Sequence, residues 1–215
     1  MKYQDIKPIS KVGREFQHLE DLVFIEGSKG AKFAVDVLEN LANDTSDVMV
    51  KWDGIPTIFW GRNTLGEFVM VNKNAWGKKE CTTSAMLESF ILGTGNNETW
   101  RVEFAQGLTA IWDILESQTP KDFRGYTFGD LLFSPAIPVN ITNETVEFTP
   151  NKVTYRIDSK SALGAKVANA KVGIAAHSLH LSFGDAAGQS VTQQFESTEL
   201  IVFAQTRSSG KVVIE

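Results

Sequence analysis

The 215-residue sequence contains a single cysteine, Cys81, so one chain cannot form an internal disulfide bond. Disulfides stabilise proteins of oxidising compartments, and their exclusion here favours a reducing compartment. The sequence also lacks any run of about 20 apolar residues, the length that a membrane-spanning helix needs. Its first residues lack the apolar segment of a signal peptide. We therefore expect a cytoplasmic protein that does not bind membranes.

Positive charge is also scarce, because 21 Lys and Arg residues face 26 Asp and Glu residues, for a formal net charge of -5. Any contact with a nucleic-acid backbone must therefore come from a local basic patch. The three histidines, His18, His177 and His180, do not have the spacing of a zinc site with the one cysteine. Aromatic residues are plentiful, with 14 Phe and 5 Trp, enough to build a sizeable core.

Hydrophobic patterns predict more strands than helices. Strand patterns occupy residues 47–60 (a hairpin), 67–71, 125–133, 146–158 (a second hairpin), 171–183, 199–205 and 211–215. Helical patterns occupy residues 30–42, 83–92, 99–117 and 159–170. Because the helices fall between groups of strands rather than after each strand, we predict an α+β fold with mainly antiparallel sheets flanked by helices. The chain is expected to form a single domain over residues 1–215.

Two details refine this prediction. Pro56 has no backbone N–H, so its strand is expected at a sheet edge or with a bulge. In the helix predicted over residues 99–117, one stripe of large apolar side chains is expected to enter the core. The stripe contains Trp100, Phe104, Leu108, Ile111, Trp112 and Leu115.

The tetrapeptide Lys51-Trp52-Asp53-Gly54 fits the pattern K-x-D-G and lies between two apolar, strand-like segments. A protonated lysine cannot act as a nucleophile, whereas an apolar site or a neighbouring cation favours the neutral amine. Lys51 follows an apolar segment, and Lys73 is the candidate for the neighbouring cation. Asp53 and Gly54 would form the turn that directs the lysine inward. The simpler interpretation is a solvated lysine at the end of a strand.

This pattern resembles the nucleotidyltransferase domain of ATP-dependent DNA and RNA ligases and capping enzymes, whose fold is similar to the ATP-grasp fold. In that family the motif lysine attacks the α-phosphate of a nucleoside triphosphate. The resemblance implies that Lys51 is catalytic and that Lys51, Asp53 and Gly54 bind the nucleotide. The segment FVMVNKNAW, residues 68–76, resembles the short basic motif after the third strand of ligases. It implies that Lys73 contacts ribose or phosphate.

Two later positions extend the resemblance. Phe128-Gly129-Asp130-Leu131 is similar to the Gly-Glu-Leu motif that faces the nucleotide, with aspartate in place of glutamate. An acid within an apolar strand is costly unless it is paired or binds a metal, so the resemblance implies that Asp130 binds the nucleotide and Mg²⁺ or Mn²⁺. The alternative is that Asp130 pairs with a neighbouring cation or with backbone amides. His177 stands where the family has an aromatic residue that stacks on the base.

Several family features are not recognisable. Pro56 replaces an arginine of DNA ligases, and Glu199 and Lys211 are only weak counterparts of the late Glu-Gly and Lys-x-Lys motifs. No oligonucleotide-binding barrel is recognised, so a C-terminally truncated core or a degenerate relative is expected. Residues 15–180 resemble uncharacterised ligase-like proteins of tailed bacteriophages, which implies a viral or metagenomic origin and the host cytoplasm.

We therefore predict a nucleotidyltransferase-like core that forms lysyl-AMP from ATP with Mg²⁺ or Mn²⁺. Its adenylate would pass to 5′-phosphorylated DNA or RNA. Two alternatives stay open. One is a phage module that binds nucleotide or nucleic acid without covalent chemistry. The other is a structural or assembly protein in which K-x-D-G is only a hairpin turn.

Overall fold

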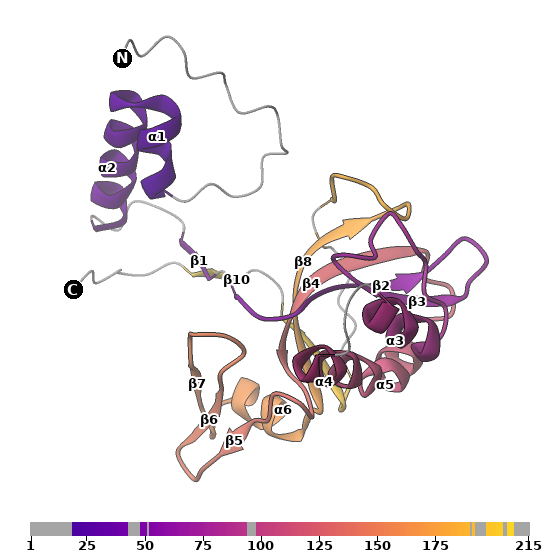
Figure 1. The fold of residues 1–215 in the computed structure, drawn as a ribbon. Helices are drawn as coiled ribbons and strands as arrows, with labels where there is room; N and C mark the ends of the chain where they lie inside the picture. Colours follow the sequence, from indigo (N-terminus) through magenta and orange to yellow (C-terminus); the bar gives the residue numbers. More distant parts are fainter. Residues whose placement is uncertain are drawn as a thin grey trace. The chain divides into compact units, whose positions relative to one another are not determined.

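The computed structural model describes residues 19–42, 48–50, 52–93, 98–189, 191, 197–203 and 206–208. The chain divides into two compact units, residues 1–50 with 206–215, and residues 51–205 (Figure 1). The fold is mixed α+β, with mostly antiparallel sheets flanked by helices, as predicted. The strand predicted over residues 211–215 lies outside the described residues, as do His18 and Lys211.

The first unit contains helices and a two-stranded sheet. A 3-10 turn, η1 (Leu19–Asp21), leads into α1 (Leu22–Glu26) and α2 (Ser28–Ala42), so the predicted helix over 30–42 is confirmed and begins slightly earlier. β1 (Val48–Val50) pairs antiparallel with β10 (Thr206–Ser208). Gly30 allows the two helices to approach closely, because a Cβ there would lie 2.1 Å from the Leu22 carbonyl oxygen.

The second unit is built on a five-stranded sheet with the order β3-β2-β4-β8-β9. These strands are β2 (Thr57–Arg62), β3 (Phe68–Asn72), β4 (Gly125–Phe133), β8 (Val172–His180) and β9 (Leu200–Phe203). Neighbours are antiparallel except β8 and β9, which are parallel. The strands predicted in these regions are confirmed, and the predicted boundaries of β4 match the observed ones.

The predicted hairpin over residues 47–60 is wrong. β1 pairs with β10, whereas β2 lies between β3 and β4. Pro56 precedes β2, so its missing N–H removes no hydrogen bond from the sheet, and β2 is central rather than at an edge. The Ile55–Pro56 peptide bond is cis, and the Pro56 carbonyl accepts a hydrogen bond from Leu131 N at 2.9 Å.

Three helices, α3 (Ser84–Gly93), α4 (Thr99–Thr109) and α5 (Trp112–Gln118), cover one face of this sheet (Figure 1). Their apolar side chains share a buried core with those of the strands, including Leu87, Leu108, Leu115, Ile58, Trp60 and Met70. Thr83 Oγ1 accepts a hydrogen bond from Met86 N at 3.2 Å and caps the N-terminus of α3.

The helix predicted over residues 99–117 is two helices, which separate at Ala110 and Ile111. The separation lets α5 change direction, so that the Trp112 ring meets the Phe68 ring edge-on at 5.1 Å. Trp100, predicted in the core, is 55 % exposed. A continuous 3.6-residue pattern therefore misled the prediction, because it cannot report a break in the helix axis.

Arg62 connects β2 to the end of α5. Its side chain is 2 % exposed, and its guanidinium donates to the carbonyl oxygens of Glu116, Thr119, Pro120 and Gly66 at 3.0 to 3.3 Å. Carbonyl oxygens at the C-terminal end of a helix carry partial negative charge. Backbone dipoles therefore compensate this buried cation.

A second core lies between the large sheet, a small antiparallel sheet and α6 (Ala162–Asn169). The small sheet contains β5 (Asn140–Ile141), β6 (Thr145–Phe148) and β7 (Tyr155–Asp158), so the hairpin predicted over 146–158 and the helix predicted over 159–170 are confirmed. Trp52 packs against this core. The K-x-D-G segment is therefore attached to the fold through its second residue.

Candidate functional site

The K-x-D-G segment is held by aromatic contacts and by Tyr155 of β7. The Trp52 ring lies 5.0 Å from the Tyr155 ring and 4.7 Å from the Phe203 ring, between centroids. The Tyr155 hydroxyl accepts a hydrogen bond from Asp53 N at 2.7 Å and donates one to Asp53 O at 3.2 Å. Lys51 itself, the predicted nucleophile, lies outside the described residues. These contacts hold the backbone of the described part of the motif in place.

Gly54 lies directly against β4. A Cβ at this position would be 2.3 Å from the Leu131 carbonyl oxygen and 2.9 Å from its carbonyl carbon, so only glycine fits without a backbone shift. The backbone N–H of Gly54 donates to the carboxylate of Asp130. The motif glycine and Asp130, far apart in the sequence, thus meet at one place in the fold.

Three groups hold the Asp130 carboxylate. Thr57 Oγ1 donates to Oδ1 at 2.7 Å, His177 Nε2 lies 2.9 Å from Oδ2, and Gly54 donates from its backbone. Burial alone would raise the pKa of Asp130, but the hydrogen bonds from His177 and Thr57, the charge interaction with His177 and the backbone N–H of Gly54 together outweigh burial and lower it. The carboxylate is therefore ionised near neutral pH. Its partners are a histidine ring, a hydroxyl and a backbone amide, so the carboxylate is paired, as the alternative interpretation expected.

A β-bulge places His177 beside Asp130. On β8, Ala176 pairs with Gly129 and Ser178 with Phe128, so His177 is the additional residue between two paired positions. The His177 and Asp130 side chains are 13 % and 12 % exposed. The sequence predicted His177 in the nucleotide site as a stacking group. Its observed contact with a carboxylate was missed, because a bulge leaves no signal in the hydrophobic pattern.

Aromatic side chains surround this cluster on the same face of the sheet. The Phe59 ring stacks on Trp76 at 3.9 Å and tilts against Phe128 at 4.7 Å. His180 is 6 % exposed, and burial lowers its pKa, which favours the neutral imidazole. Its Nε2 lies 3.0 Å from Ser178 Oγ. The polar cluster therefore borders an apolar, aromatic environment in which electrostatic interactions are strong.

Lys73 lies in the exposed turn that follows β3. Asn72 pairs with Ile58, and the preceding residue of β2, Thr57, pairs with Asp130. The turn therefore begins at the end of the sheet where Asp130 lies. Two strand spacings, together about 10 Å, separate β3 from β4. The structure brings Gly54, Asp130 and His177 together and leaves Lys73 at the neighbouring edge.

A protein family matches nearly the whole chain. The family is described as "Family of unknown function (DUF6267)", and its model matches residues 14–213. The chain belongs to this family. The match includes Gly54, Asp130 and His177, so the whole cluster lies inside the DUF6267 region. Searches of curated proteins and of solved structures found no match.

The ligase resemblance implies that Asp130 of the DUF6267 chain binds Mg²⁺ or Mn²⁺. In the described ranges, no three His, Cys, Asp or Glu side chains are grouped to hold a metal ion. Mg²⁺ is often bound by only one or two carboxylates together with substrate phosphates and water. A carboxylate has about four acceptor positions, and the protein uses three of those on Asp130. Asp130 therefore fits as a single carboxylate ligand.

Two further observations concern expectations drawn from the sequence. Glu199, the weak counterpart of a late ligase motif, forms an ion pair with Lys171. Over the part of the DUF6267 chain that the structure describes, no helix is both long and apolar enough to span a bilayer.

Proposed function

We propose that this chain is the nucleotidyltransferase-like core of a DNA or RNA ligase relative. The observation that carries the proposal is the contact between Gly54 of K-x-D-G and Asp130 on β4. A K-x-D-G sequence that arose by chance has no reason to lie against an ionised and mostly buried carboxylate. Such clusters of charge and burial are typical of functional sites.

The proposed reaction uses the lysine amine as a nucleophile. The lone pair of the neutral Lys51 amine attacks the α-phosphorus of ATP, and the bond to the bridging oxygen of pyrophosphate breaks. The amine proton leaves to solvent, and the product is lysyl-AMP. Asp53 and Gly54 hold the backbone of the segment, and Lys73 supplies positive charge from the β3 edge. The adenylate then passes to a 5′-phosphate on DNA or RNA.

Asp130 has two functions in this proposal. It would hold Mg²⁺ or Mn²⁺ together with the nucleotide phosphates, and the ion would supply positive charge against the charge that develops on them. It also fixes the ring of His177 through the contact at 2.9 Å. His177 thereby presents a planar side chain from β8 to the nucleotide.

The first prediction concerns covalent labelling. Incubation of the full chain with ATP labelled at the α-phosphate, with Mg²⁺ or Mn²⁺, is expected to give one adenylyl group per chain. Pyrophosphate is expected to reverse the reaction. Lys51→Ala should abolish the label, because no other amine replaces the nucleophile. The measurement is a denaturing gel together with intact-protein mass spectrometry.

Lys121→Ala is the matched control, because Lys121 is an exposed lysine in the turn before β4. It should label as the wild type does. Equal labelling of Lys51→Ala and wild type would exclude Lys51 as the attachment site.

A second candidate function keeps nucleotide binding and omits the covalent step. It is favoured by the hydrogen bonds that Asp130 already makes to Thr57, His177 and Gly54, which leave one acceptor position of the carboxylate for a metal and explain the buried charge without one. Calorimetric titration with ATP distinguishes the two. Binding without an adduct supports this second candidate, and the absence of both binding and adduct supports an assembly role.

A further inference from the structure

The hydroxyl of Tyr155, on β7, bonds both backbone groups of Asp53. A phenol hydroxyl can donate one hydrogen bond and accept another. Here it accepts from Asp53 N at 2.7 Å and donates to Asp53 O at 3.2 Å. Asp53 lies between Val50, where β1 ends, and Thr57, where β2 begins, so strand pairing does not provide partners for its backbone groups. A side chain from a distant strand provides them instead.

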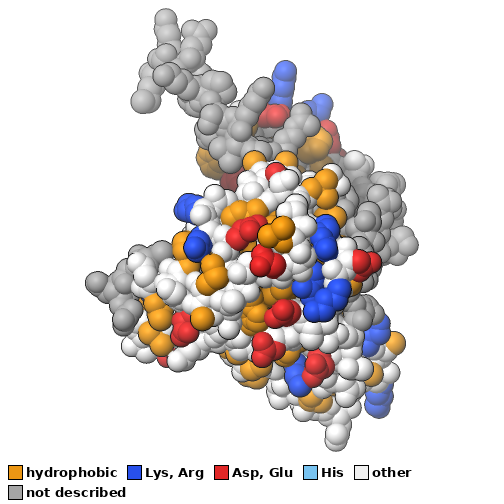
Figure 2. All heavy atoms as spheres, turned by 90° about the vertical axis from the view of Figure 1, so that its right-hand side faces the viewer, with side chains coloured by type: hydrophobic (Ala, Val, Ile, Leu, Met, Phe, Trp, Pro, Cys, Tyr) orange, Lys and Arg blue, Asp and Glu red, His pale blue; other side chains and the backbone are white. Residues whose placement is uncertain are grey.

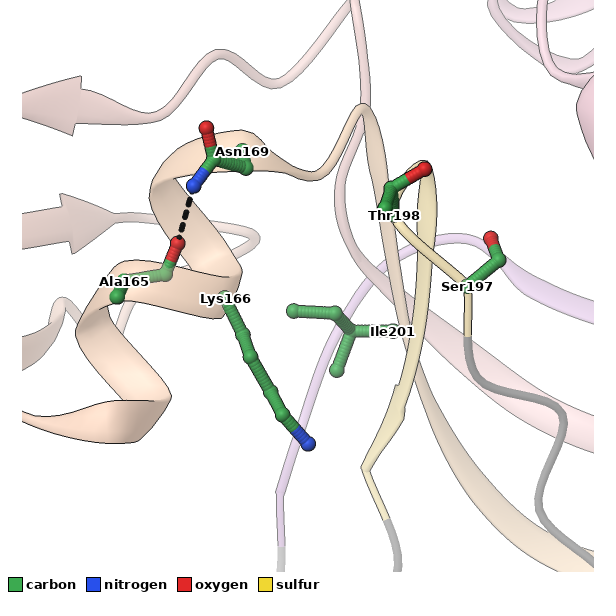
Figure 3. Close-up of a pocket in the computed structure, with 6 residues that line it drawn as sticks. All are labelled: Ala165, Lys166, Asn169, Ser197, Thr198 and Ile201. Carbon is green, nitrogen blue, oxygen red and sulfur yellow. Dashed lines mark hydrogen bonds between the residues drawn. The ribbon is translucent and has the colours of Figure 1, made fainter.

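The ring of Tyr155 is held by packing, which fixes the position of its hydroxyl. Its centroid lies 5.3 Å from that of Phe148, its partner on β6, and 5.0 Å from that of Trp52. Phe148 is 2 % exposed and belongs to the second core. Figure 3 shows a neighbouring part of this core, where Ile201 of β9 points toward α6. The hydroxyl therefore extends from a packed scaffold.

Three consecutive residues of the motif are held by three different strands. The Trp52 ring lies 4.7 Å from the Phe203 ring of β9, and Gly54 lies against the backbone of β4. Tyr155 of β7 holds the residue between them. The small sheet contributes no residue to the proposed site around Asp130, so its contact with the motif is what connects it to that site.

We infer that Tyr155 is a positioning residue for the formation of lysyl-AMP, an inference that rests on the proposed function. It acts through the backbone of Asp53, two residues after Lys51 in the sequence. A displacement of about 1 Å at the reacting groups can lower a rate about a hundredfold. In this role the hydroxyl restrains the motif and makes no contact with the nucleotide. Its loss therefore lowers the rate of adenylation and leaves the affinity for ATP unchanged.

The test is Tyr155→Phe, which keeps the ring and removes only the hydroxyl. In the full chain, the single-turnover rate of labelling at saturating ATP should fall about tenfold or more. The ATP concentration that gives half of this rate should change less than about twofold. Tyr126→Phe is the matched control, because the hydroxyl of the buried Tyr126 donates to Glu80 rather than to the motif. This control should label at the wild-type rate.

Hydrogen exchange at the Asp53 amide gives a second measurement that needs no ATP. In the ¹⁵N-labelled full chain, Tyr155→Phe should speed this exchange about fivefold or more, because one hydrogen bond is lost. Tyr126→Phe should leave it unchanged.

The two measurements separate the inference from the proposed function. If the wild type takes no label, the proposed function fails, whereas faster exchange at Asp53 in Tyr155→Phe alone would still support Tyr155 as the residue that positions the motif. Unchanged exchange at Asp53 would overturn the inference in either case. Where the wild type is labelled, a wild-type labelling rate in Tyr155→Phe, or an equal loss of rate in both tyrosine variants, would also overturn it.

Discussion

Asp130 keeps its charge within a strand because its neighbours compensate it. Thr57 donates a hydrogen bond to Oδ1, His177 lies against Oδ2, and Gly54 donates a hydrogen bond from its backbone. A buried carboxylate without such partners would take up a proton instead. The same contacts orient His177, so the pair acts as one unit in the proposed site.

Asp130→Asn is expected to lower the free energy of unfolding by about 1 to 3 kcal/mol at pH 7, because hydrogen bonds to a charged group are replaced by neutral ones. The pKa of Asp130 is lowered from its ordinary value of 3.8 in the folded protein. The stabilisation is therefore complete above that value and is lost as the pH falls through the lowered pKa. Urea unfolding of wild type and variant at pH 7, 5 and 3 measures the difference, which should shrink only at the lowest pH.

Asp122→Asn is the control for this experiment, because Asp122 lies in an exposed turn. Its effect should stay within about 0.5 kcal/mol at every pH. If the difference in free energy of unfolding between wild type and Asp130→Asn grew as the pH was lowered, this result would contradict the proposed ionisation of Asp130.

At the scale of elements, the connection from β1 to β2 is the feature that forms the site. It makes no hairpin, and instead Trp52 enters the second core while Gly54 packs on the backbone of β4. Two backbones approach this closely only where a side chain is absent. The position of the K-x-D-G segment therefore depends on Gly54 in addition to the contacts of Trp52 and Tyr155.

Gly54→Ala should destabilise the protein by about 1 to 3 kcal/mol, because the new methyl group would overlap the Leu131 carbonyl. The shift of the segment away from Asp130 should also reduce any adenylation. Gly93→Ala is the opposite control, because a Cβ there meets no atom within 4 Å at the end of α3. It should be neutral or stabilising by up to about 1 kcal/mol. Thermal unfolding of both variants gives the comparison. If Gly54→Ala left the stability unchanged, the β4 backbone would have to shift to accommodate the new methyl group.

At the scale of the whole molecule, charge is distributed unevenly. Figure 2 shows acidic side chains scattered over one face and several Lys and Arg side chains gathered on one side of it. Lys73, Lys78 and Lys79 are exposed in the single turn after β3. The turn is held by Trp76, whose ring stacks on Phe59. Under the proposed function, this turn is the candidate for the local basic patch that a polynucleotide would need on a chain of net charge -5.

Binding of a 5′-phosphorylated single-stranded oligonucleotide is therefore expected to be weak and strongly salt-dependent. Each phosphate contact contributes about 0.7 to the slope of log affinity against log salt. The combined Lys73→Gln, Lys78→Gln and Lys79→Gln variant should lower the slope by about 2. Fluorescence anisotropy at several salt concentrations measures it. Substitution of Lys121, Lys152 and Lys160 by Gln gives the same net charge and should leave the slope unchanged, so equal slopes for the two variants would exclude the turn as the contact.

Local patterns in the sequence were enough to predict most elements of the fold. The apolar content of residues 125–133 predicted β4, the 3.6-residue period of residues 30–42 predicted α2, and short helical patterns predicted α3 and α6. The α+β class with mainly antiparallel sheets followed from their order along the chain. These features depend on neighbours within a few residues, so a single sequence contains them. The ligase-type core, and the functions of Lys51, Asp53 and Lys73 within it, stay predictions.

The tertiary structure decided which segments meet. β1 pairs with β10 rather than with β2, β9 lies parallel to β8, and a bulge turns His177 toward Asp130. Strand pairing depends on contacts between residues distant in the chain, and a bulge depends on the register of two strands, so neither appears in a local pattern. Asp130 was found from the sequence as an acid in an apolar strand, but its partners Thr57, Gly54 and His177 became visible only when three separate segments were brought together.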